Sequence, residues 1–269
     1  MPDAIATGSE HALSTLRFAS LGSGSGGNAL VVSTGDTTVM LDCGFSATEA
    51  KRRLARLGLQ PEQLSAIVVT HEHDDHIGGV ARFSRRHGVP VWMSHGTWRG
   101  LEPMFDGVSI NLIEGYEAFS VGNLRIEPFP VPHDAREPAQ YVFGAGTFRL
   151  GVLTDTGEVT RHIESVLSRC DALVIECNHD PDLLARSNYP PRLRARISSR
   201  VGHLDNRAAA QILSRVAWPG LRHVIAAHLS EQNNSPDLAQ RALAGALGCE
   251  PEWIGIARQD TGFDWRDLG

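Results

Sequence analysis

Short apolar runs and amphipathic segments alternate along the chain from about residue 16 to residue 265. Apolar runs rich in Val, Ile and Leu, bounded by Gly, Pro or Asp, are typical of buried strands. They predict strands at residues 16–21, 29–32, 38–41, 66–70, 89–93, 124–128, 140–143, 148–153, 172–176, 222–226 and 253–257.

Helical spacing of the apolar positions predicts amphipathic helices at residues 47–57, 77–86, 159–168, 205–216 and 236–247. The last helix has a clear start, with Ser235 as its cap and Pro236 as its first residue. Two strand-and-helix sets in series predict an α/β protein with a four-layered αββα sandwich. Because no Gly/Ser/Pro-rich linker interrupts them, we expect one domain over residues 16–269, preceded by a flexible tail at residues 1–15.

The composition, 42% hydrophobic and 21% charged, is that of an ordinary globular protein. Residues 1–15 contain no Lys or Arg and no continuous apolar run, and no later stretch approaches about 18 apolar residues. We therefore expect a cytoplasmic protein that does not bind membranes. The four scattered cysteines form no CxxC pair, which argues against a disulfide framework and a thiolate zinc site.

A net charge of −6 argues against indiscriminate binding to nucleic acid. The distribution of the charge along the chain changes this picture. Between Leu183 and Leu204 the chain has no acidic residue but five arginines: Arg186, Arg192, Arg194, Arg196 and Arg200. This stretch predicts a local basic surface suited to phosphate groups.

The candidate chemistry begins directly after the predicted strand 66–70, with His71, His73, Asp75 and His76. A helix scatters these four side chains around its axis, and a strand points His76 away from His73. A loop that curves around a bound group is therefore needed to bring the four side chains together. A loop rich in imidazole and carboxylate groups suits a divalent metal.

Three more ligand candidates follow predicted strands: His133, Asp155 and His228. Seven candidates exceed the needs of one zinc ion and suit two. We place His71, His73 and His133 on one metal, and Asp75, His76 and His228 on the other. In this arrangement Asp155 bridges the pair, and the metals are zinc or manganese, with iron also compatible.

Two cations a few ångströms apart supply a nucleophile at neutral pH and neutralise developing charge, so the constellation predicts a hydrolase in which Asp75 and Asp155 belong to the catalytic centre. Asp42, at the end of another predicted strand, is a candidate to orient a ligating imidazole. An ordinary turn residue before Gly44 is the alternative.

The series His71-x-His73-x-Asp75-His76, followed by His133, Asp155 and His228, resembles the motifs of the metallo-β-lactamase superfamily. Five further motifs resemble the YycJ (WalJ) family over about residues 16–257: Leu21–Asn28, Glu176–Asp180, Tyr189-Pro190, Gly202–Asn206 and His228–Asn234. The resemblance implies the metallo-β-lactamase fold. It also implies a DNA exonuclease that degrades from the five-prime end, with a link to mismatch repair.

The same resemblance suggests the substrate residues. Gly202-His203 is similar to an element of tRNase Z, which implies that His203 transfers a proton to the leaving oxygen; a structural histidine at a helix start is the alternative. Asn28, His179 and Asn233 are tentative substrate contacts from the motifs. We expect Arg192, Arg194 and Arg196 to contact backbone phosphates. The Gly-rich turn at residues 22–28 either presents amides to a phosphate or forms a tight strand connection.

A phosphodiesterase acting on DNA is thus the leading hypothesis, and other functions stay open. An RNA-processing enzyme of the tRNase Z kind needs the same centre. So does a small-molecule hydrolase that acts on a cyclic phosphodiester or a thioester; a lactamase fits least well. A non-catalytic regulatory module that keeps its metals belongs to a different class. The sequence leaves metal identity, polarity of digestion and oligomeric state open.

Overall fold

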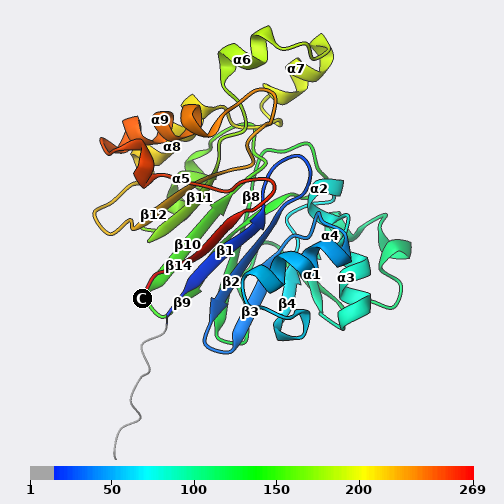
Figure 1. Ribbon diagram of the computed structural model, residues 1–269. Coiled ribbons are helices and arrows are strands. Elements are labelled where there is room, and N and C mark those ends of the chain that lie inside the picture. Colours follow the sequence, from blue (N-terminus) through cyan, green and yellow to red (C-terminus); the bar gives the residue numbers. More distant parts are fainter. Residues whose placement is uncertain (1–14) are drawn as a thin grey trace, which may run out of the picture.

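The computed structural model describes residues 15–269, and the tail predicted for residues 1–15 lies outside them except for Thr15. Two seven-stranded sheets face each other and carry helices on their outer faces (Figure 1). The strand order is β14-β1-β2-β3-β4-β5-β6 in the first sheet and β13-β12-β11-β10-β9-β8-β7 in the second.

The first sheet is antiparallel from β14 to β3 and parallel from β3 to β6. Its strands are β1 (Arg17–Gly22), β2 (Ala29–Thr34), β3 (Thr37–Leu41), β4 (Ala66–Val68), β5 (Val91–Ser94), β6 (Ile110–Ile113) and β14 (Phe263–Asp267). The helices of this half are α1 (Ala47–Arg56), α2 (Asp74–Ile77), α3 (Val80–His87) and α4 (His95–Trp98).

The second sheet is antiparallel from β7 to β10 and parallel from β10 to β13. Its strands are β7 (Phe119–Val121), β8 (Leu124–Pro130), β9 (Ala139–Ala145), β10 (Phe148–Leu153), β11 (Ala172–Glu176), β12 (His223–Ala227) and β13 (Gly255–Ile256). The helices of this half are α5 (Arg161–Leu167), α6 (Pro181–Arg186), α7 (Pro191–Ile197), α8 (Asn206–Val216) and α9 (Pro236–Leu247).

The core lies in three layers, which explains why most strands are apolar on both faces. Along β1, Phe18 packs between the two sheets, whereas Ala19 and Leu21 pack under the helices of the first half. A third apolar cluster joins the second sheet to α5, α8 and α9. The predicted αββα sandwich is confirmed. The assignment of residues 16–269 to one domain stays a prediction.

Several elements escape the sequence patterns. The helices α6 and α7 contain Leu184 as their one buried residue, so the apolar periodicity that marks an amphipathic helix is missing. In the edge strand β14, polar residues separate the two aromatic residues, and most of the strand is exposed. Strands β6 and β7 are short and only partly buried. The strand predicted for residues 253–257 is wrong in extent, because a 3-10 turn at Pro251–Trp253 leaves β13 with two residues. By contrast, Ser235 and Pro236 open α9 as predicted.

One edge of the sandwich collects the polar ends of the strands. The loops after β3, β4, β8, β10, β11 and β12 all lead away from this edge, where carboxyl ends of parallel strands meet. Asp42, Asp155 and His228 have positive φ angles of 59°, 50° and 53° close behind their strands. Such left-handed backbone is strained for residues other than glycine and concentrates at functional sites.

Among the described helices, none is long and apolar enough to cross a bilayer.

Candidate metal centre

Three histidine rings converge at this edge. His71 and His73 follow β4, and His133 follows β8. His71 Nε2 lies 3.0 Å from His73 Nδ1, and His133 Nε2 lies 3.2 Å from the same Nδ1. Ring nitrogens from three imidazoles that face one another form a donor set typical of zinc and similar ions. The structure thus brings together the three residues predicted for the first metal.

A second group contains Asp75, His76 and His228, whose ligand atoms lie within 4.8 Å of one another. Asp75 Oδ2 is 3.5 Å from His76 Nε2 and 3.4 Å from His228 Nε2. Asp75 and His76 belong to the short helix α2, and His228 directly follows β12. These are the residues predicted for the second metal.

Asp155 lies between the two groups and is 1% exposed. Its Oδ2 is 3.1 Å from His76 Nε2, and its Oδ1 is 3.1 Å from His228 Nδ1 and 3.9 Å from His133 Nε2. Within residues 15–269, Oδ2 accepts no hydrogen bond of normal geometry. A buried carboxylate oxygen without a donor is costly unless a cation faces it. The donor set therefore fits a pair of divalent cations, with Asp155 between them.

Hydrogen bonds behind the rings determine which nitrogen faces the centre. His76 Nδ1 donates to Asp42 Oδ2 at 2.8 Å, and His133 Nδ1 donates to the carbonyl oxygen of Gly202 at 3.1 Å. Because a carbonyl or carboxylate oxygen only accepts, each Nδ1 carries the hydrogen and each Nε2 keeps a lone pair for a ligand. Asp42 also accepts from the amide and hydroxyl of Thr70, at 2.8 and 2.9 Å. A simple turn residue would not need these contacts.

The carboxylates dominate the electrostatics of the centre. Burial alone would lower the pKa of His76, but Asp155 and Asp42 hold that pKa well above its ordinary value. Burial also opposes the raised pKa of His228, which Asp155 maintains. Burial, reinforced by His76, lowers the pKa of His71 well below the ordinary value. Protons on His76 and His228 and a bound cation are therefore alternative ways to neutralise the carboxylates.

Glu176 is a further member of the site, to which the sequence motifs assign no role. This carboxylate closes β11, is fully buried, and accepts from His203 Nδ1 at 2.7 Å; His228 Nδ1 lies 3.3 Å away. Burial would raise the pKa of Glu176, but His203 lowers it to about 2. A carboxylate at the end of the wholly apolar run Ala172–Ile175 is the sequence signal that could have identified it.

His203 lies beside the centre, with its ring 5.4 Å from that of His133 and 5.2 Å from that of His228. Its Nδ1 lies 3.5 Å from Asp155 Oδ1, and its side chain is 21% exposed. Burial would lower the pKa of His203, but Glu176 raises it above the ordinary value. An imidazole with access to solvent is suited to proton transfer.

The three tentative substrate contacts from the motifs are buried. Asn28 accepts from the Gly24 amide at 2.9 Å and places Nδ2 at 3.1 Å from His76 Nε2. His179 and Asn233 are 3% and 1% exposed. Their burial favours support of the site over direct contact with a substrate, which stays a prediction for all three.

The Gly-rich turn is a tight strand connection. Its amides donate within the protein: those of Ser23, Gly24, Gly26, Gly27 and Asn28 bond to Arg258, Asn28, Gln259, Gly24 and Asp75 respectively. A phosphate cradle built from these five amides would have to break these bonds, so the structure favours the alternative reading of the turn.

The residues from Pro181 to Ile197, comprising α6 and α7, form an arm that projects from the edge above the centre (Figure 1). Arg196 Nε donates to Asp134 Oδ2 at 2.6 Å, and Asp134 Oδ1 lies 3.8 Å from His73 Nε2. Arg194 donates to the carbonyl oxygen of Ala185 within the arm. Arg192 is exposed, and no described carboxylate lies within 4.0 Å of it. The predicted basic surface is therefore only partly free.

A family model described as the beta-lactamase superfamily domain matches residues 37–229, a span that holds all seven candidate ligands. The chain belongs to the beta-lactamase superfamily. It is 35% identical over 237 residues to exodeoxyribonuclease YycJ of Bacillus anthracis, covering 86% of this chain and 89% of that protein. It is 32% identical over 245 residues to exodeoxyribonuclease WalJ of Streptococcus pneumoniae, covering 89% and 91%.

These relatives confirm the resemblance to the YycJ and WalJ family. As a member of the superfamily with a cluster of metal-ligating side chains, this protein is a metal-dependent hydrolase. The fold matches that of the metallo-β-lactamase fold protein YhfI from Bacillus subtilis, with a TM-score of 0.74 over 95% of this chain and all of that one. At 15% identity, this likeness bears on the fold alone.

Proposed function

We propose that this hydrolase is a two-metal DNA exonuclease that removes nucleotides from the five-prime end. The observation that carries the proposal is the convergence of seven candidate ligands around Asp155, beside an arm with an exposed arginine. The names of the YycJ and WalJ relatives support DNA as the substrate.

In this proposal His71, His73 and His133 would hold one cation, and Asp75, His76 and His228 the other, with Asp155 shared. When bound, the cations supply a nucleophile at neutral pH and neutralise charge on the phosphoryl oxygens. Asp42 and Gly202 keep the lone pairs of His76 and His133 available.

His203 would protonate the leaving oxygen. Its Nδ1 donates to Glu176, which leaves Nε2 to hold the transferable proton. Glu176 raises the pKa of His203 against the effect of burial, so this carboxylate favours a proton on the ring. Glu176 thus positions His203 without touching the substrate.

The arginines of the arm would bind backbone phosphates. Charge reversal across Arg192, Arg194 and Arg196 is expected to weaken DNA binding and leave the metal content intact. Since Arg194 and Arg196 also hold the arm, Arg192→Glu alone is the sharper variant. Loss of one phosphate contact should make the negative slope of log K against log salt less steep by about 0.9. Arg125→Glu, on the exposed start of β8, is the matched control.

Further details belong to the same proposal. Zinc or manganese is the expected metal because mixed imidazole and carboxylate sites accept both. The proposal includes a role in mismatch repair, which the family resemblance implies, and a cytoplasmic location, which we expect from the sequence.

The deciding experiment is digestion of end-labelled DNA. Duplex and single strands, with and without a five-prime phosphate, would be incubated with the protein in manganese or zinc, beside matching RNA strands and a cyclic nucleotide. Early release of labelled mononucleotide from five-prime-labelled DNA is the expected result. Preferential cleavage of RNA or of the cyclic diester would replace the proposed substrate, and two bound ions without any hydrolysis would favour a regulatory module.

A further inference from the structure

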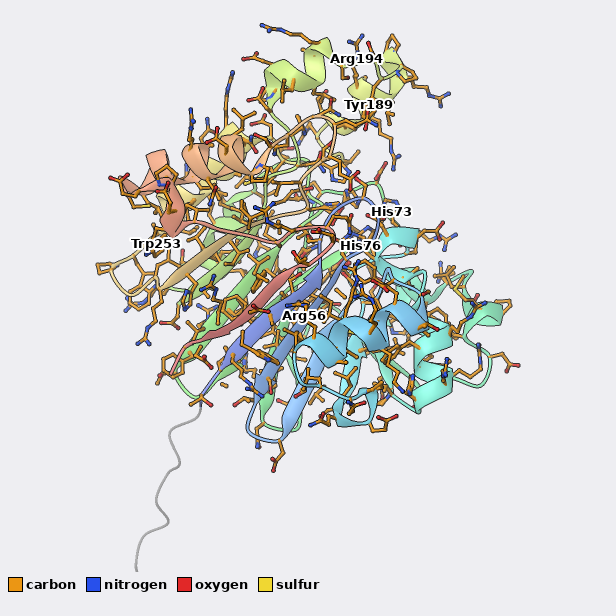
Figure 2. All side chains as sticks on the ribbon, viewed as in Figure 1. Arg56, His73, His76, Tyr189, Arg194 and Trp253 are labelled. Atoms are coloured by element: carbon orange, nitrogen blue, oxygen red, sulfur yellow. The ribbon has the colours of Figure 1, made fainter. Side chains whose placement is uncertain are left out.

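An opening of about 310 Å³ lies between the arm and the Gly-rich turn. Six residues line it: Ser25, Gly26, Tyr189, Ser230, Glu231 and Gln232. Figure 2 places Tyr189 on the arm between Arg194 and the labelled His73 and His76. The opening therefore has one wall on the arm and the opposite wall on the body of the protein.

Two of the segments that line the opening are joined in sequence to residues of the metal centre. On the turn side, Asn28 closes the loop that carries Ser25 and places Nδ2 at 3.4 Å from Asp75 Oδ2. On the other side, Ser230 comes two residues after His228, and its amide donates to the carbonyl oxygen of Asn178. The opening therefore lies at the same edge of the sandwich as the metal centre.

The chemistry of the walls suits a nucleoside better than a phosphate. Tyr189 supplies an aromatic ring, and Ser25, Ser230 and Gln232 supply neutral groups that donate and accept. Glu231 adds a negative charge, and the six lining residues include no cation. A phosphate would be repelled here, whereas a base stacks on an aromatic face and offers amino and carbonyl groups to polar side chains. The volume lies at the lower end of the range for small-molecule sites, which fits one nucleoside.

We propose that this opening is the subsite for the terminal nucleoside of the DNA strand, with the base against the ring of Tyr189. The inference rests on the proposed function and adds to it the part of the substrate that is recognised beside the scissile phosphate. It also gives the arm a second purpose: α6 and α7 carry the stacking residue as well as the arginines.

Stacking on an aromatic side chain is worth about 5- to 150-fold in binding for each base. Tyr189→Ala should raise KM for five-prime-labelled DNA by a factor in that range and change kcat less. Tyr189→Phe keeps the ring and should restore the parent value. Leu183→Ala is the matched control, because Leu183 is an exposed apolar residue on the same arm, 40% accessible, that does not line the opening.

The decisive comparison uses two substrates that differ only at the terminal nucleotide, one with its base and one abasic. If the ring stacks on the base, Tyr189→Ala loses affinity for the normal end and leaves KM for the abasic end unchanged. An equal loss on both substrates would overturn the inference, as would a loss in Leu183→Ala or a failure of Tyr189→Phe to rescue. Failure of the proposed function is a different outcome, in which the parent protein itself does not shorten DNA.

Discussion

Asp42 offers a direct test of how the fold prepares the metal centre. In Asp42→Asn, the amide of Thr70 forces the new side-chain oxygen to keep its place, so the NH₂ group faces His76 Nδ1. Because that NH₂ group only donates, His76 must accept at Nδ1 and carry its hydrogen on Nε2. The lone pair that faces Asp75 and Asp155 is then lost.

The loss of the carboxylate at position 42 should weaken metal binding by an amount that two known costs bracket in the same way. Replacing a charge-assisted hydrogen bond at a buried group costs about 1.5–3 kcal/mol. Loss of a carboxylate that orients a ligating histidine costs about 10- to 100-fold in metal affinity, or about 1.4–2.7 kcal/mol. Asparagine tolerates the positive φ of 59° at position 42, so the backbone should be retained.

Calorimetric titration with zinc and with manganese, together with elemental analysis, measures the result. We expect Asp42→Asn to weaken one of two sites by 10- to 100-fold and to leave the other near the parent value. Asp36→Asn, in the exposed turn between β2 and β3, makes the same chemical change and should have no effect. Binding of two ions with parent affinity by Asp42→Asn would refute the tautomer argument.

Asp155→Ala should reduce the metal content from two ions per chain to fewer than one, because this carboxylate lies between both groups; elemental analysis that still finds two ions would contradict the shared position. Because the carboxylates raise the pKa values of His76 and His228, a metal must displace protons from these rings. Metal affinity should therefore fall, as the pH is lowered, by about tenfold per pH unit for each proton displaced. Calorimetry between pH 5 and 8, roughly the window in which histidines titrate, measures this, and a metal affinity that does not change with pH would contradict it. Gly44→Ala should lower the free energy of unfolding in urea by about 1–3 kcal/mol, because its Cβ would lie 1.9 Å from a backbone oxygen of α2. Gly245→Ala, in the interior of α9 where no atom lies within 4 Å of the added Cβ, should raise that free energy by about 0.5–1 kcal/mol. Similar free energies of unfolding for the two variants would contradict the close packing of Gly44.

The sequence predicted the ligands well because chemistry and position coincide in them. His71, His73 and His76 follow an apolar strand at spacings that no helix or strand can use on one face. Asp155 and His228 follow strands of the second sheet, and the fold brings their ends to the same edge. The layered architecture was accessible for the same reason, since strands buried on both faces leave a continuous apolar signature.

Other parts of the site depend on contacts that periodicity does not encode. Glu176 looks like the polar end of a strand, and only the packing of His203 and His228 against it gives it a role. The arm has too few buried residues to produce a helical pattern, so its shape and the position of Tyr189 were not predictable. Asn28 suggested a substrate contact by its motif, but its buried side-chain amide lies against His76 Nε2 and Asp75 Oδ2.

The left-handed residues explain why the centre requires so large a scaffold. Asp42, Asp155 and His228 each adopt a conformation that costs about 1–2 kcal/mol for most residues other than glycine, and less for a short polar side chain such as that of Asp. Even a part of that cost at three positions matters against the roughly 5–15 kcal/mol by which a folded domain is stable. Glycine would remove the strain but would supply no ligand or supporting carboxylate. The strain persists because the strands before these residues are buried on both faces, so the core that holds β3, β10 and β12 also holds the donor atoms in place when a cation arrives.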